Sequence, residues 1–409
     1  MNVTIAILGL ALLILVHEAG HFYTARAVGM SPRRFYIGFP PALVKVRRKG
    51  IEYGVGAIPL GGYVKIPGMH RPAPSDLDVH FARARHEAPE LGGMIERIKR
   101  LVAEGEMGEA RAQFSELERD IRNAELTPGA AKAAERGLNE LRDALGADAY
   151  WRQKTWRKVA VIFAGPGTNL VFAILLIAIV YMVGVPSEAS RSVDRVDADS
   201  PAEQAGLRPG DVIVAVNGVP ASDFDELSSL IRGSEGSAIE VTVRRRGQTV
   251  TLEPERTERS SDGRWVFGFR PDVVYKRYGP LESTELAFRE SWRVTEAIGG
   301  SLGRIVTGEG RDEISSPVGI VDASSEVIDE GGIRLYLRIL AFISLSLAIL
   351  NLLPLLPLDG GHIAFSLVEG LRGRAGGREI YERVSAVGIA LVLILFFVGL
   401  SNDIGGRPD

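Results

Sequence analysis

Four long apolar runs constrain what this 409-residue chain can fold into. They cover residues 1–24, 159–187, 339–358 and 384–402. A helix needs about 20 predominantly apolar residues to cross the hydrocarbon core of a bilayer. The last three runs are long enough alone, and the first is long enough if it includes its polar stretch at residues 17–21. We therefore predict an α-helical polytopic membrane protein with transmembrane helices over residues 1–24, 159–185, 335–358 and 381–402.

The first run has two other interpretations, a cleaved signal peptide and a buried helix of a soluble protein. No Lys or Arg precedes the run, and no small-residue cleavage site lies before His17, which disfavours a signal peptide. The three further apolar runs disfavour a soluble protein. The first run is therefore also interpreted as a membrane span.

The charged residues of the loops predict an orientation. Basic residues cluster at residues 26–49, 152–158 and 372–383, and the positive-inside rule places these segments in the cytoplasm. Both chain ends and residues 187–338 are then expected outside. The formal charge of −3 offers no strongly basic patch, so a nucleic-acid partner is not predicted. The chain has no cysteine, which excludes thiol nucleophiles, disulfides and cysteine zinc sites.

Ionisable residues lie inside the first run, in the stretch LILVHEAGHF at residues 13–22. His17 and His21 are four residues apart, so a helix places both imidazoles on one face, where they can bind one metal ion. Glu18 is one step away and can act as general base toward a zinc-activated water attacking a carbonyl. A polar patch buried between helices is the alternative, but ionisable groups within spans are costly and usually functional.

Catalytic zinc generally takes three protein ligands and leaves one position for water. Glu52 is one candidate for the third ligand, and it lies in a basic, strand-like segment. Asp359 is the better candidate, in NLLPLLPLDGGH at residues 351–362, and we expect it at the cytoplasmic end of the third span. Pro354 and Pro357 break the helix there, and the two glycines allow close backbone approach.

These motifs resemble those of the bacterial site-2 proteases, the RseP/RasP-like intramembrane zinc metalloproteases. HEAGH, IPLGGYVKIPGM at 58–69, FAGPGTNL at 163–170, a PDZ-like segment, SPVGI at 316–320 and the LDGGH segment follow the family order. The resemblance implies Zn²⁺ as cofactor. It also implies roles for individual residues: His17, His21 and Asp359 as metal ligands, Glu18 as catalytic base, Asn351 as a substrate-binding residue, and Asn169 as a core position that is not catalytic.

The remaining segments complete a predicted domain order. The pattern of residues 33–70 predicts short strands. The resemblance implies a membrane-associated β-hairpin region whose edge strand holds the substrate in an extended conformation. A plain cytoplasmic β-ribbon is the alternative. The spacing of apolar residues in 73–150 predicts a cytoplasmic insertion of three short amphipathic helices. The favoured interpretation of this insertion is a solvated spacer. Residues 186–272 resemble an extracytoplasmic PDZ-like α+β domain that gates or recruits substrates, and residues 273–334 form an extracytoplasmic linker with helices.

The predicted function is therefore an intramembrane zinc metalloendopeptidase of the bacterial plasma membrane, with its active site near the cytoplasmic side. The resemblance implies single-pass membrane proteins as substrates, such as anti-sigma-factor-like proteins and remnant signal peptides, cut after a prior outer cut. A membrane-tethered PDZ adaptor or chaperone with a vestigial metal site is the alternative, and a zinc-dependent transporter is a second one. A vestigial site would have lost a ligand or the base, whereas this chain keeps all four residues. A transporter would need further acidic or histidine residues along the second and fourth spans, and the apolar runs at residues 159–187 and 384–402 contain none.

Overall fold

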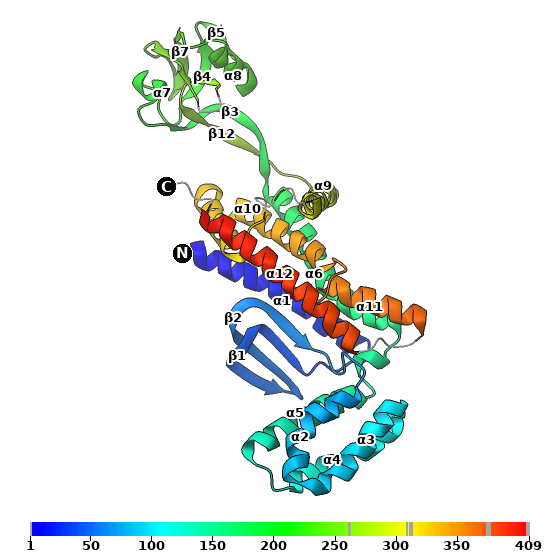
Figure 1. The fold of residues 1–409 in the computed structure, drawn as a ribbon. Helices are drawn as coiled ribbons and strands as arrows, with labels where there is room; N and C mark the ends of the chain where they lie inside the picture. Colours follow the sequence, from blue (N-terminus) through cyan, green and yellow to red (C-terminus); the bar gives the residue numbers. More distant parts are fainter. Residues whose placement is uncertain (1, 261–262, 308–309, 311–313, 374–377, 406–409) are drawn as a thin grey trace. The chain divides into compact units, whose positions relative to one another are not determined.

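The computed structural model describes residues 2–260, 263–307, 310, 314–373 and 378–405. These residues form two compact units, one mainly helical and one built around a β sheet (Figure 1). The helical unit comprises Met1–Ile177 and Ala287–Asp409. The sheet unit comprises Ala178–Leu286.

Four helices carry the apolar runs: α1 (Asn2–Ala27), α6 (Thr155–Val183), α10 (Pro317–Asn351) and α12 (Arg378–Gly405). Each contains a stretch long and apolar enough to cross a bilayer, and in α10 this stretch begins at Gly332, where the backbone leaves the helical region. The third span was predicted to reach residue 358, and that was wrong. The helix ends at Asn351, because prolines three and six residues later cannot continue it.

Small residues bring the spans of the helical unit close together. A Cβ added to Gly9 in α1 would overlap the hydroxyl of Tyr336 in α10, and that hydroxyl donates to the carbonyl of Ile5 at 2.9 Å. A Cβ added to Gly20 would lie 2.3 Å from the carbonyl oxygen of Ala164 in α6. Close backbone approach of this kind is a main source of helix association in membranes.

The β region is built from two long strands, β1 (Arg34–Arg48) and β2 (Ile51–Lys65). The first residues of β1 pair with two different parts of β2, so that Phe35 lies opposite both Tyr53 and Val64. The end of β1 pairs with the start of β2, with Arg48 opposite Ile51. Residues 62–65 pair only with residues 34–37 in the register of this sheet, and they therefore form one of its edges.

The insertion that follows contains four helices, where three were predicted. They are α2 (Pro74–Glu87), α3 (Gly92–Glu104), α4 (Met107–Asn123) and α5 (Pro128–Leu145), with 3₁₀ turns η1 (Pro89–Leu91) and η2 (Tyr150–Arg152). The apolar sets of α3, α4 and α5 are buried together in one core. The prediction missed α2 because its core face has only two large apolar residues, Leu77 and Phe81, and is completed by Ala84.

The sheet unit is built around a six-stranded sheet in the order β12-β3-β4-β7-β8, with β5 paired to β4. Its main strands are β3 (Val185–Val196), β4 (Val212–Val216), β5 (Val219–Pro220), β7 (Val241–Arg245), β8 (Gln248–Thr251) and β12 (Phe269–Lys276). Short strands β6 (Ala238–Ile239), β9 (Glu255–Arg256), β10 (Glu258–Arg259) and β11 (Trp265–Val266) and helices α7 (Pro201–Gln204) and α8 (Phe224–Arg232) complete it. β3 and β12 remain paired as far as Val185 and Lys276, past the predicted boundary at residue 272.

A buried ion pair joins two parts of the sheet unit. Arg245 in β7 donates from Nε and Nη2 to both carboxylate oxygens of Asp211, at 2.8 and 2.7 Å. Burial raises the pKa of the Asp211 carboxyl, but the bonds from Arg245 and from the backbone amide of Arg208 outweigh this and hold the pKa below its ordinary value. The ionised pair therefore stabilises the folded unit at neutral pH.

Two further helices complete the chain. α9 (Pro280–Thr307) follows the sheet unit, and α11 (Asp359–Arg372) begins after the turns at residues 352–358. Asp359 was expected at the end of the third span, but it is the first residue of α11. The correction follows from the early end of α10, which leaves a connection of seven residues between the two helices.

Candidate metal centre

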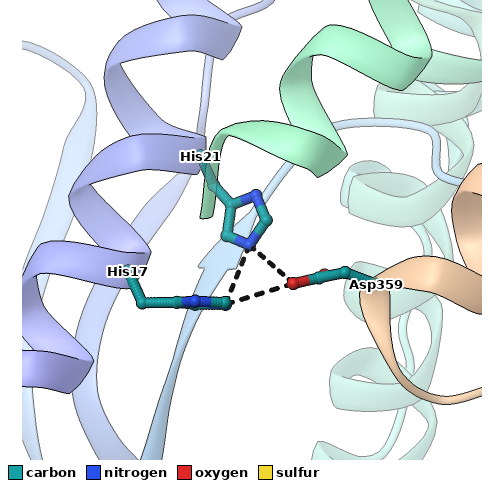
Figure 2. A group of neighbouring side chains, drawn as sticks. All are labelled: His17, His21 and Asp359. Carbon is teal, nitrogen blue, oxygen red and sulfur yellow. Dashed lines mark hydrogen bonds and ion pairs between the residues drawn. The ribbon is translucent and has the colours of Figure 1, made fainter. Parts of the chain in front are cut away.

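Three side chains converge where α1 meets the start of α11 (Figure 2). His17 Nε2 and His21 Nε2 are 3.2 Å apart, and Asp359 Oδ2 lies 3.2 Å from the first and 3.4 Å from the second. Zinc bonds of about 2.0–2.1 Å in a tetrahedron place neighbouring ligand atoms about 3.3 Å apart. The three atoms therefore have the mutual spacing that one zinc ion requires.

Burial of polar atoms in this group also favours a bound cation. Within the part of the chain that the structure describes, Asp359 Oδ2 and His17 Nδ1 are buried side-chain atoms without a hydrogen-bond partner. A buried carboxylate oxygen is costly unless a proton donor or a cation compensates its charge. Two imidazole nitrogens and a carboxylate oxygen at such short distances also repel one another through their lone pairs unless a proton or a metal cation lies between them. The residues present therefore fit a bound Zn²⁺.

His21 is oriented by helix α6. Its Nδ1 donates to the carbonyl of Val161 at 2.8 Å, which leaves Nε2 free to bind a metal. A backbone carbonyl at the second ring nitrogen is a common way to fix the tautomer of a metal-binding histidine. Gly165 faces both rings, and an added Cβ there would lie 2.3 Å from His21 Nε2 and 2.9 Å from His17 Cε1. Only glycine leaves room for the two imidazoles at this point of α6.

Asp359 reaches the histidines because the connection before it is tightly turned. An added Cβ on Gly360 would lie 2.2 Å from the carbonyl oxygen of Leu352, and one on Gly361 would lie 2.5 Å from the backbone nitrogen of Leu356. The two glycines thus let the start of α11 fold against the preceding turns. This agrees with the close backbone approach expected from the LDGGH sequence.

Glu18 lies next to this group and is 8% exposed. Its carboxylate interacts with the backbone of Val64, and an added Cβ on Gly62 would lie 2.8 Å from Glu18 Cγ. The edge of the β sheet at residues 62–65 therefore runs directly beside Glu18. Glu18 lines the same cavity as the two histidines and Asp359, so it is accessible to a substrate in that cavity.

The other predicted residues lie in different surroundings. Asn351 lines the cavity, and its side-chain nitrogen donates to the carbonyl of Leu347 at 3.0 Å. Asn169 is fully buried in α6, and its backbone carbonyl accepts from Ser344 at 2.9 Å. Glu52 is not part of the metal group. It accepts from the Tyr36 hydroxyl at 2.7 Å, and this bond, with nearby Arg34, holds the pKa of the Glu52 carboxyl below its ordinary value.

Sequence reasoning missed three contributors to the site. The Val161 carbonyl and Gly165 orient and accommodate the histidines, although Gly165 stands in the quoted FAGPGTNL motif. His362, in the quoted LDGGH motif, lines the cavity and shares a hydrogen bond of 2.9 Å with the Tyr381 hydroxyl of α12. Gly165 and His362 lie within motifs that the sequence analysis identified, but only the fold shows which residues they contact.

The fold and the site together define a class of protein. Four membrane-length helices carry an HExxH motif within a span, and an aspartate more than 300 residues away completes a three-residue metal group. This arrangement is that of a polytopic membrane metalloprotease.

The chain belongs to peptidase family M50, whose family model matches residues 5–395. It is 30% identical to the zinc metalloprotease Rip1 of Mycobacterium tuberculosis strain H37Rv, over 96% of this chain and 91% of the relative. It is 28% identical to the zinc metalloproteases RasP of Shouchella clausii and of Bacillus licheniformis, over 99% of each chain. The chain is thus a membrane zinc metalloprotease of the site-2 protease family, with Zn²⁺ as its cofactor.

Proposed function

We propose that this protease cuts single-pass membrane proteins within or beside their membrane span, as the second cut of regulated intramembrane proteolysis. Anti-sigma-factor-like proteins and remnant signal peptides are the substrates we expect. The observation that carries the proposal is the metal group of His17, His21 and Asp359 with Glu18 beside it, all lining one cavity. The two histidines and Glu18 lie on a membrane-length helix. A site at this position serves substrates that are themselves in the membrane.

Each residue of the site has a proposed role. His17, His21 and Asp359 would hold the zinc ion, which supplies Lewis-acid activation of water and of the scissile carbonyl. Glu18 takes the proton from the attacking water and passes it to the leaving amine. Asn351 lines the cavity at the end of α10 and is proposed to hold the substrate backbone.

The sheet edge beside Glu18 supports a mode of substrate binding. A helical substrate resists proteolysis because its backbone amides and carbonyls are bonded to one another. Residues 62–65 lie at the edge of the β1–β2 sheet and line the cavity next to Glu18. We propose that a substrate segment adds to this edge as an extended strand, which exposes its scissile carbonyl to the site.

The orientation of the chain is proposed from its charges. The basic loops at residues 26–49, 152–158 and 372–383 would lie in the cytoplasm of a bacterial cell, with the protein in the plasma membrane and the active site near the cytoplasmic side. The sheet unit would then be extracytoplasmic. We propose that it is a PDZ-like domain, because it combines a six-stranded sheet with two short helices and resembles bacterial PDZ sequences over residues 186–272.

Replacing the proposed base tests the function directly. Glu18→Gln should retain zinc, because Glu18 is not one of the three ligands, but it should lose nearly all hydrolysis, because an amide cannot accept the proton of water. The measurement is zinc content and cleavage of a single-pass model substrate by purified protein in liposomes. Near-native cleavage by Glu18→Gln would refute this mechanism, and absence of cleavage by the zinc-loaded wild type would favour the adaptor alternative.

A further inference from the structure

The cavity that contains the candidate metal site extends to the helical insertion. Its volume is about 680 Å³, within the range of about 300–1,000 Å³ that is usual for ligand pockets. The metal group, Glu18 and the sheet edge line one part of it, and residues of α2 and α5 line another. The insertion therefore forms a wall of the active-site cavity, although the sequence alone favoured a solvated spacer.

This wall is fastened to elements that carry the site. The buried carboxylate of Asp143 in α5 accepts from Arg33 Nε at 2.8 Å and lies 3.2 Å from Lys65 Nζ at the end of β2. The amide of Tyr150 donates to the carbonyl of Pro67 at 2.9 Å, and its hydroxyl shares a hydrogen bond of 3.0 Å with Ser366 of α11. The cavity face of the insertion is thus held in a defined position relative to the sheet edge and α11.

Two polar side chains stand on this wall where α2 and α5 cross. His80 Nε2 of α2 donates to Glu140 Oε2 of α5 at 2.9 Å, and both residues line the cavity. The crossing is close because Gly137 has no side chain: an added Cβ there would lie 2.5 Å from His80 Cβ. The Glu140 side chain is 55% exposed, so its carboxylate can bind a partner while His80 orients it.

The charges of the wall favour a cationic partner. Lys65 is paired with Asp143, and the Arg71 guanidinium lies over the ring of Trp151 at 5.8 Å. The carboxylate of Glu140 accepts one hydrogen bond from His80 through Oε2, and the exposed remainder of the carboxylate faces the cavity, where it can accept further bonds from a cation. Segments that flank membrane spans on the cytoplasmic side are enriched in Lys and Arg, so a substrate presents the complementary charge on that side.

We propose that the insertion is a specificity element in which Glu140 binds basic residues of the substrate segment that flanks the membrane span. His80 is a positioning residue that orients the Glu140 carboxylate. The inference rests on the proposed function and orientation, because it assigns a wall of the same cavity to the cytoplasmic flank of the same substrate. The new element is the nature of that flank: it is a basic segment that lies close to the scissile bond.

A charge swap between enzyme and substrate tests this inference. Full-length protein in liposomes is given two single-pass substrates that differ only in a Lys-rich or a Glu-rich flank. We expect the wild type to prefer the Lys-rich flank, and Glu140→Lys to lose about tenfold in kcat/KM on it, mainly through KM, since attraction becomes repulsion. Glu140→Lys should correspondingly gain on the Glu-rich flank. Glu140→Gln should show a smaller loss in the same direction.

Glu135→Lys is the matched control, because Glu135 is exposed on the same helix and is not among the residues that line the cavity in the described part of the chain. It makes the same charge change and should leave the flank preference as in the wild type. His80→Ala should raise KM for the Lys-rich substrate. His80→Gln, whose amide can still donate to Glu140, should have a KM close to that of the wild type.

The outcomes separate this inference from the function on which it rests. If the wild type cuts both substrates and Glu140→Lys keeps the wild-type preference, or Glu135→Lys changes the preference equally, the specificity role is wrong while the protease function stands. If the zinc-loaded wild type cuts neither substrate, the proposed function itself is overturned, and the flank assignment with it. Zinc content and thermal unfolding of each variant identify any that fail to fold.

Discussion

Adding one methyl group to helix α6 should weaken zinc binding without removing a ligand. In Gly165→Ala the new Cβ would lie 2.3 Å from His21 Nε2 and 2.9 Å from His17 Cε1. Nonbonded carbon and nitrogen atoms prefer about 3.5 Å, so the His21 ring would have to move by about 1 Å. Metal sites tolerate deviations of only about 0.2 Å in ligand distance. The displaced ring would therefore no longer be a good ligand.

The expected magnitude follows from the cost of overpacking. Inserting a methyl group into a well-packed site typically costs about 1–3 kcal/mol. If that cost falls on the metal-bound state, zinc affinity should fall by about 5- to 150-fold. Activity at limiting zinc should fall in parallel. The fold itself should be little affected, because alanine is favoured over glycine by about 0.5–1 kcal/mol within a helix.

Gly167→Ala is the matched control on the same helix. An added Cβ there meets the ring of Phe163 at 3.1 Å and beyond, and that side chain is 45% exposed and can move aside. Both variants gain the same helix propensity, so the difference between them isolates the contact with the histidines. The assay is competition for zinc between a chelator and each purified protein. Zinc affinity of Gly165→Ala within about twofold of the control would refute the packing of His17 and His21 against α6.

Three further predictions concern other parts of the chain. Asp359→Ala should lower both zinc stoichiometry and activity; unchanged stoichiometry would mean that the third ligand lies elsewhere. Asp211→Asn should reduce the free energy of unfolding of the sheet unit by about 1–3 kcal/mol at pH 7. The pKa of Asp211 is lower in the folded than in the unfolded chain, so its contribution to stability is present above about pH 4 and is lost as the pH falls further. The thermal unfolding temperatures of variant and wild type should therefore converge in acid. Replacing residues 186–272 by a short linker should release cleavage of untrimmed substrates if this segment gates entry; slower cleavage of trimmed substrates, with untrimmed ones still uncut, would indicate recruitment instead.

Features set by local sequence were predictable. Membrane-length helices follow from uncharged apolar runs, because their length and composition are properties of one contiguous segment. The placement of His17 and His21 on one face follows from the helical repeat, and Glu18 follows from its spacing to them. Their match to HExxH identified the metal chemistry before any fold was known. Asp359 was chosen over Glu52 as the third ligand because a carboxylate was expected at the cytoplasmic end of the third span, and the resemblance of its LDGGH segment to a family motif agreed with that choice.

Other features depend on contacts between distant segments, and these leave no periodic signal in the chain. The spacing of about 3.3 Å among three donor atoms arises only when α11 is folded against α1. The need for glycine at residue 165 comes from the imidazoles on another helix, and the role of Val161 comes from its carbonyl. The insertion shows the difference most clearly. Its amphipathic helices were predictable from apolar spacing. Only the tertiary structure places His80 and Glu140 on the wall of the active-site cavity. Their position depends on the contacts of Asp143 and Tyr150, which hold the insertion against the rest of the helical unit.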